Sequence, residues 1–106
     1  MSVAKISVRK SSIHGSGVFA DQTIRRGRLI GRFEGRPTRR NGRYVLWVAD
    51  RDDRLRGIQG TCELRFLNHA VKPNAEFRAD RVFALRTIRP GEEITCHYGD
   101  DWEDVY

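Results

Sequence analysis

The sequence predicts a mostly-β domain with several short strands and one short helical turn. Turn-forming residues recur about every ten residues, and β-branched or aromatic clusters lie between them. No window carries a sustained helical stripe of apolar residues with a cap at each end. A chain of 106 residues leaves room for one hydrophobic core, so we expect residues 1–106 to form a single domain.

Most of the expected strands begin just after a turn signal. Gly27 and the pairs Asn41-Gly42 and Pro90-Gly91 precede three of them, because Gly accepts positive φ and Pro fixes the backbone of a turn. Three residues separate the fifth and sixth strands, which is typical of a hairpin. The predicted strands cover residues 6–9, 18–20, 28–33, 44–49, 76–78, 82–85 and 93–98. The best helical segment is residues 62–67, and residues 36–43 are expected to form an arginine-rich loop.

Composition favours a folded protein outside the membrane. Apolar residues make up 39% and charged residues 32%, values that argue against disorder. The longest apolar run, residues 44–49, is far shorter than the roughly 20 residues that span a bilayer. The N-terminal residues lack the apolar stretch of a secretory signal. We therefore expect a protein that is not secreted, in the cytoplasm or on a nucleoid or chromatin.

The two cysteines predict free thiols. Cys62 and Cys96 are the only cysteines, and neither belongs to a Cys-x-x-Cys pair. Two isolated cysteines cannot build a disulfide framework or a cysteine-rich zinc site. No second histidine or carboxylate stands at metal-ligand spacing from His69, so we expect no metal site.

Charge is unevenly distributed along the chain. The net charge is +6, divided into +12 over residues 1–89 and −6 over residues 90–106. A basic body is typical of nucleic-acid binding, and an acidic end suits a cationic peptide. A solvated surface explains the same numbers equally well, so charge alone leaves the partner open.

Three segments carry residues suited to ligand binding. Residues 14–19 read His-Gly-Ser-Gly-Val-Phe, and residues 65–74 read Arg-Phe-Leu-Asn-His-Ala-Val-Lys-Pro-Asn. Residues 89–102 read Arg-Pro-Gly-Glu-Glu-Ile-Thr-Cys-His-Tyr-Gly-Asp-Asp-Trp. Paired glycines expose backbone groups, and an Asn-His pair offers a carboxamide and an imidazole. Each segment taken singly is typical of an ordinary turn or strand.

The order and spacing of these segments resemble the SET-domain lysine methyltransferases. That family reads Gly-x-Gly, then Arg-Phe-Ile-Asn-His-Ser-x-x-Pro-Asn, then Pro-Gly-Glu-Glu-Ile/Leu-Thr-x-x-Tyr. The resemblance covers residues 6–102 and is strongest to small, stand-alone SET proteins of viral and bacterial type, without flanking zinc modules. It implies several small β-sheets, with the Asn68-His69 segment threaded under the C-terminal strand in a pseudoknot-like arrangement.

The resemblance also implies a binding site for S-adenosyl-L-methionine. By similarity, the backbone of residues 14–17 lines the cofactor, and the other residues contact its carboxylate, amino group and adenine. The implied cofactor-binding residues are His14, Gly15, Ser16, Gly17, Tyr44, Arg65, Phe66, Asn68, His69 and Trp102. Trp102 is expected to cover the adenine, because an aromatic ring gains area and stacking at small entropic cost.

Tyr98 is the implied catalytic residue, at the end of a lysine channel that also includes Cys96 and Leu46. The transfer is an in-line displacement by a neutral amine, so the enzyme aligns the reactants and excludes water. A lysine has a pKa of about 10.4, and an apolar channel beside a positive sulfonium lowers it. Cys96 stands where the family often has Phe or Tyr, which leaves the number of methyl groups open.

The implied partner is a lysine-bearing protein, such as a histone or another basic chromosomal protein. One alternative is a catalytically weak SET scaffold that binds nucleic acid through its basic surface. Against it, the aromatic residues do not interleave with the arginines of residues 36–43 to form a stacking platform. The other alternative is a cofactor-binding module that recruits proteins. A homodimer is expected to stabilise so small a domain.

Overall fold

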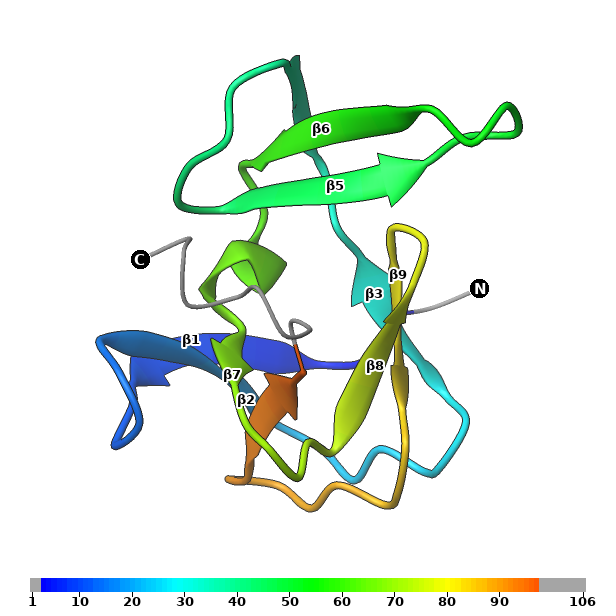
Figure 1. Ribbon diagram of the computed structural model, residues 1–106. Helices are drawn as coiled ribbons and strands as arrows, with labels where there is room; N and C mark the ends of the chain where they lie inside the picture. The colour runs from blue at the N-terminus through cyan, green and yellow to red at the C-terminus, as the bar shows by residue number, and fades with distance from the viewer. Residues whose placement is uncertain (1–2, 98–106) are drawn as a thin grey trace.

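The computed structural model describes residues 3–97, which form ten β-strands and one 3₁₀ helix (Figure 1). The strands are grouped into three small sheets, which confirms the mostly-β prediction. The helical segment is a single 3₁₀ turn, η1 (Glu63–Phe66), at the position predicted from the sequence. In the described part of the chain no helix has the length and apolar character needed to cross a membrane.

The first sheet holds the two ends of the described chain together. Strand β10 (Glu93–Cys96) lies between β2 (Ser16–Ala20) and β7 (Asn68–His69). It is antiparallel to β2 and parallel to β7, so Thr95 lies opposite Asn68. Strand β1 (Ile6–Lys10) completes the sheet as an antiparallel neighbour of β2.

The second sheet has the order β3-β9-β8 and contains the predicted hairpin. The three strands are β3 (Leu29–Arg32), β9 (Arg81–Ala84) and β8 (Ala75–Arg78). Ala79, at φ 53°, and Asp80 form the turn of the hairpin. The Arg32 guanidinium donates to the Asp80 carboxylate at 2.6 Å, which ties β3 to this turn and raises the pKa of Arg32.

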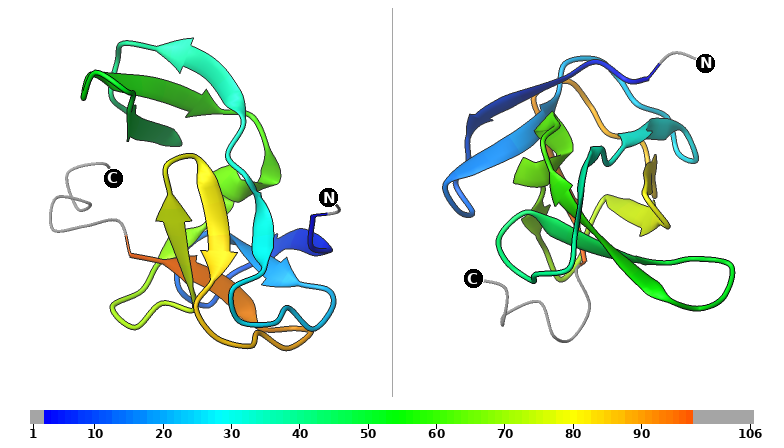
Figure 2. Two further views of the ribbon diagram at one scale, coloured as in Figure 1. Left: turned by 90° about the vertical axis from the view of Figure 1, so that its right-hand side faces the viewer. Right: turned by 90° about the horizontal axis from the view of Figure 1, so that it is seen from above.

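The third sheet departs most from the sequence prediction. It has the order β4-β6-β5, formed by β4 (Gly35–Thr38), β6 (Leu55–Gly60) and β5 (Val45–Ala49). Residues 36–43 were predicted as loop, yet β4 occupies their first part, and β6 was not predicted at all. Both strands contain glycine, and β4 contains proline; these residues have low β-propensity, so the pairing with neighbouring strands overrides local preference. Figure 2 shows this sheet at one end of the molecule, beyond the other two.

The hydrophobic core gathers residues from all three sheets and from η1. Among the described residues, half of its sixteen buried members are β-branched, as expected for side chains that pack between small twisted sheets. The largest fully buried side chains are Ile24, Ile30, Leu67, Ile88, Ile94, Val18, Val82 and Cys96.

The Asn74 side chain holds strand β10 in place at the chain crossing that the resemblance implied. Its side chain donates to the Glu93 carbonyl at 2.8 Å and accepts the Thr95 backbone N–H at 2.8 Å. Asn74 is 3% exposed, so these bonds replace water on two buried backbone groups of β10. The C-terminal strand is thereby held between β2 and the segment 68–74.

We expect Asn74→Ala to destabilise the fold by about 2 kcal/mol, because two buried backbone groups lose their partners. For a domain of this size the melting temperature should fall by about 10 °C. Thermal unfolding followed by circular dichroism measures the change. Lys72→Ala, an exposed change two residues away, serves as the control and should leave the melting temperature nearly unaltered. Equal melting temperatures for the two variants would contradict the role given to Asn74.

Candidate functional site

The Gly-x-Gly segment lies where the loop of the β1–β2 hairpin ends: Gly15 is the last loop residue, and Ser16 and Gly17 begin β2. The Ser11 N–H donates to the Gly15 carbonyl at 2.8 Å, and the Ser11 hydroxyl accepts the Ile13 N–H at 2.9 Å. Gly15 has φ 45°, a left-handed conformation that favours glycine. This loop turns the carbonyl groups of His14 and Ser16 toward strand β7.

Asn68 joins this loop to the C-terminal strand. Its side-chain nitrogen lies 3.0 Å from the His14 carbonyl, 3.1 Å from the Ser16 carbonyl and 2.8 Å from the Glu93 carboxylate. A carboxamide nitrogen has two hydrogens, so these three acceptors share them. Asn68 is 4% exposed, and its position is therefore closely fixed. The structure brings the three predicted segments together at this one side chain.

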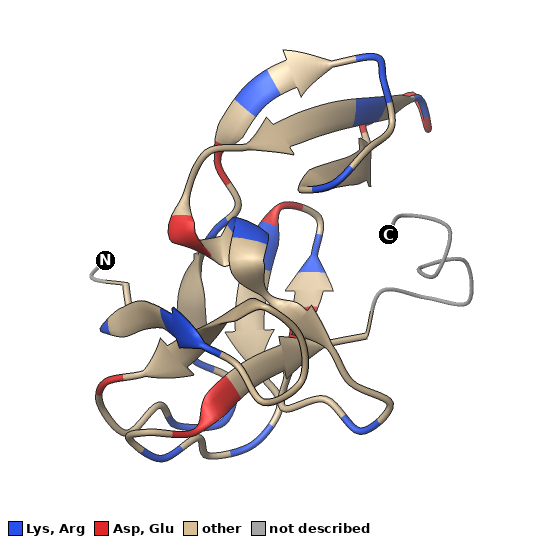
Figure 3. Cartoon of the chain, turned by 90° about the vertical axis from the view of Figure 1, so that its left-hand side faces the viewer, with Lys and Arg blue, Asp and Glu red and all other residues tan. Residues whose placement is uncertain are grey.

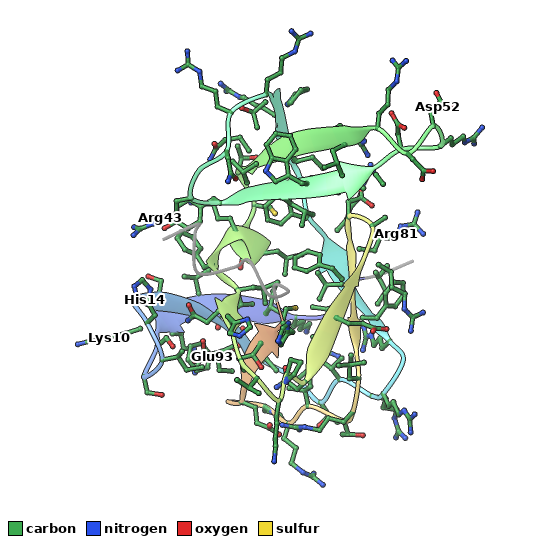
Figure 4. The ribbon with its side chains drawn as sticks, in the orientation of Figure 1. Lys10, His14, Arg43, Asp52, Arg81 and Glu93 are labelled. Atoms are coloured by element: carbon green, nitrogen blue, oxygen red, sulfur yellow. The ribbon has the colours of Figure 1, made fainter. Side chains whose placement is uncertain are left out.

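Glu93 completes this junction, and the sequence analysis did not assign it. One carboxylate oxygen accepts from Asn68, and the other accepts the Ser11 hydroxyl at 2.7 Å. The carboxylate lies so close to Gly17 that a Cβ there would overlap it, which explains a glycine at that position. Figure 4 shows His14 and Glu93 on the same side of the molecule. The sequence showed only a carboxylate at the start of the predicted strand 93–98, and this does not identify its partners.

A second group of predicted residues forms an aromatic cluster beside η1. The Tyr44 and Phe66 rings meet edge to face, with centroids 5.4 Å apart. The Arg65 guanidinium lies 4.2 Å from the Phe66 ring centre and donates to the Thr61 and Cys62 carbonyls at 2.9 Å. Tyr44 adopts φ 67°, and its carbonyl accepts the Gly60 N–H at 2.7 Å. This left-handed backbone starts β5 one residue later than the sequence predicted.

His69 lies against His97, the last described residue. Their ring centroids are 4.6 Å apart because β7 and β10 run parallel with Cys96 opposite His69. Burial, and secondly the nearby His97, lower the pKa of His69. Cys96 is fully buried, and this burial raises the pKa of its thiol to about 12, so the thiol is neutral.

The remaining predicted site residues are Leu46, Cys96, Tyr98 and Trp102. Leu46 packs against the hydrophobic core, and Cys96 is part of it, so their assignment to a lysine channel stays a prediction. Tyr98 and Trp102 lie outside the described residues. Within residues 3–97 no three His, Cys, Asp or Glu side chains cluster as a metal site would require.

Acid is expected to weaken the fold through His69. The unfolded imidazole has a pKa of about 6.5, and the folded value is lower, so the unfolded chain binds the proton first. The contribution of His69 to stability is therefore complete above about pH 6.5 and is lost as the pH falls through the lowered pKa. Urea unfolding between about pH 8 and pH 5 measures this loss, which His69→Gln should reduce. An unchanged pH dependence in that variant would contradict the assignment.

Comparison with known proteins agrees with this geometry. The SET domain family model matches residues 15–99. The chain is 29% identical to human histone-lysine N-methyltransferase 2B over 121 aligned residues, covering 94% of this chain and 4% of that protein. The chain spans less than a fifth of the length of the curated relatives it matches.

Solved structures show the same fold. One is ctPRC2 in an autoinhibited conformation bound to S-adenosylmethionine, with a TM-score of 0.79, 20% identity, and coverage of 93% of this chain and 16% of that one. Another is the methyltransferase domain of human PR domain-containing protein 2, with a TM-score of 0.73, 25% identity, and coverage of 92% and 80%. The family match extends over most of the chain and includes the second segment and most of the other two segments that meet at Asn68. The chain therefore belongs to the SET domain family.

Proposed function

We propose that this protein transfers a methyl group from S-adenosyl-L-methionine to lysine side chains of a protein substrate. The observation that carries the proposal is the convergence on Asn68 of three segments far apart in the sequence. Relatives named as histone-lysine methyltransferases support the same activity. Beside Asn68, the Gly15 loop and the aromatic pair of Tyr44 and Phe66 lie on neighbouring elements, and together these groups suit a polar cofactor.

The chemistry of the described residues suits the cofactor. The Asn68 side-chain oxygen accepts no hydrogen bond from any residue among 3–97, so it is available to the cofactor's amino group. The Arg65 guanidinium and the Tyr44 ring would lie toward its carboxylate, and Phe66 would pack along it. The backbone of residues 14–17 would line the remaining edge. When bound, S-adenosylmethionine supplies a methyl group on a positively charged sulfur.

In this proposal the chain itself aligns the amine and keeps it unprotonated. The Tyr98 hydroxyl, with nearby backbone carbonyls, orients the lysine nitrogen in line with the methyl carbon. In this role the Tyr98 hydroxyl orients the amine, and we do not assign it as the base. Apolar channel walls, proposed to include Leu46 and Cys96, disfavour the ammonium form of the lysine.

The decisive experiment incubates the protein with methyl-labelled S-adenosylmethionine and histones or other basic chromosomal proteins. Label should enter the substrate, and peptide mass spectrometry should find lysines heavier by whole methyl increments. The same proteins with their lysines chemically acetylated are the matched control and should take up no label. Cofactor binding without transfer to any lysine protein would overturn the proposal and favour a protein-interaction module.

We extend the proposal to the substrate class, the location and the assembly of the protein. The substrate class is histones or other basic chromosomal proteins, and the working location is on chromatin or a nucleoid. We also propose that residues 1–106 fold as one domain and that two copies associate. Sedimentation equilibrium should then give twice the chain mass, and a monomer at all concentrations would exclude the dimer.

A further inference from the structure

The third sheet and its loops carry a concentration of arginine. Residues 36–56 hold seven of the seventeen arginines of the chain, and all seven are exposed. The same span contains three aspartates and no glutamate. Figure 3 shows the basic segments distributed over this end of the molecule. The seven residues are Arg36, Arg39, Arg40, Arg43, Arg51, Arg54 and Arg56.

This positive charge is not neutralised within the described residues. The four ion pairs of residues 3–97 use arginines outside the span 36–56. The Asp50 carboxylate accepts the backbone N–H groups of Asp52 and Arg54 and so stabilises the β5–β6 turn. It forms no ion pair with a guanidinium among the described residues. The guanidinium groups of this sheet are therefore available to an anionic partner.

A groove on the same sheet combines two of these arginines with an aromatic ring. It has a volume of about 580 Å³. Its lining residues come from all three strands and the adjoining loop: Pro37, Thr38, Arg39, Trp47, Leu55, Arg56 and Gly57.

Trp47 is held in place within this groove. It lies opposite Gly57 in the register, and its ring approaches to 2.9 Å the position that a Cβ of Gly57 would occupy. Its indole N–H donates to the Asn41 side chain at 3.0 Å. Along the chain the aromatic residues do not interleave with the arginines of residues 36–43. In the folded sheet β6 joins β5 to β4, so Trp47 and Arg39 line one groove.

We propose that this groove binds single-stranded nucleic acid. Guanidinium groups make bidentate contacts to phosphates, and a half-buried tryptophan offers a surface on which a base stacks. An acidic protein would match the charge but would not use the aromatic ring that lines this groove together with two arginines. The proposal goes beyond methyl transfer and does not depend on it, since none of these residues belongs to the proposed cofactor or lysine site.

Fluorescence anisotropy with a labelled single-stranded oligonucleotide, measured over a range of salt concentrations, tests the proposal. The double variant Arg39→Gln/Arg56→Gln should bind about tenfold more weakly. Its plot of log affinity against log salt should lose about 1.4 from the slope, the value for two phosphate contacts on a single strand. Both arginines are exposed, so the variant is expected to fold.

The matched control is Arg25→Gln/Arg26→Gln. It removes the same charge from an exposed loop at the other end of the molecule (Figure 1). The control should bind like the parent protein. Equal weakening in both double variants would mean that net charge alone drives binding, and this result would overturn the proposal.

Two further measurements separate the possible partners. Trp47→Phe retains an aromatic ring and should bind nearly as the parent does, whereas Trp47→Leu should lose about tenfold by removing the stacking. Polyglutamate that competes as well as the oligonucleotide would assign the groove to acidic protein and overturn the proposal. Methyl transfer by Arg39→Gln/Arg56→Gln to a free lysine peptide should equal that of the parent. This assay keeps the two proposals distinguishable.

Discussion

Replacing Tyr98 by phenylalanine should lower the rate of methyl transfer about 100-fold while S-adenosylmethionine binds with nearly unchanged affinity. The change removes one oxygen, and an orienting group acts only when amine and methyl carbon are aligned. A misplacement of about 1 Å at the reacting atoms costs about this factor. The effect should appear in kcat, because an interaction made in the transition state does not alter ground-state binding.

Titration calorimetry measures cofactor binding, and a labelled-methyl assay measures kcat on the same preparations. Tyr106→Phe removes the same atom from a tyrosine with no proposed role, so it should behave as the parent protein does. If Tyr98→Phe turns over as fast as that control, the hydroxyl does not orient the reaction. If it loses cofactor affinity instead, Tyr98 belongs to the cofactor site.

Asn68→Asp should destabilise the fold by about 3–4 kcal/mol. The substitution keeps the shape of the side chain and removes both hydrogens that it donates. The new carboxylate would face the His14 and Ser16 carbonyls and the Glu93 carboxylate at hydrogen-bond distance. Each buried acceptor left without a donor costs about 1–3 kcal/mol, and two carboxylates add repulsion.

A second substitution distinguishes this contact from general damage to the core. Glu93→Gln supplies a donor opposite the new carboxylate, so the double variant Asn68→Asp/Glu93→Gln should recover part of the lost stability. Chemical denaturation of the four proteins gives the coupling energy by a double-mutant cycle. Recovery would assign the loss to the Asn68–Glu93 contact. Strictly additive effects would show that this contact does not hold the three segments together.

Many of the strands and turns could be predicted from local sequence. The Pro90-Gly91 pair and the three-residue spacing of the 76–85 hairpin predicted the strands beside them, and each was confirmed. These predictions succeeded because turn geometry depends on the residues within the turn itself. The three motif segments likewise identified the SET family, since their order and spacing can be compared directly along the sequence.

Strands β4 and β6 could not be predicted from local sequence. Their residues include arginine, glycine and proline, and only pairing on both sides of β6 makes these segments extended. The role of Glu93 was hidden for a related reason. Its partners Ser11 and Asn68 lie 82 and 25 residues away, and no local pattern records a hydrogen bond over that separation.

A mostly-β class, most strand positions and the family could be predicted from the amino-acid sequence, because propensity and turn chemistry are local and motif order runs along the chain. Which side chains meet depends on how the strands pair. The passage of β10 between β2 and β7 brings Asn68 to Glu93 and the Gly15 loop, and β6 joins β5 to β4, so that Trp47, Arg39 and Arg56 line one groove. The physical reason is that strand pairing and burial act between residues close in space, whatever their separation along the chain.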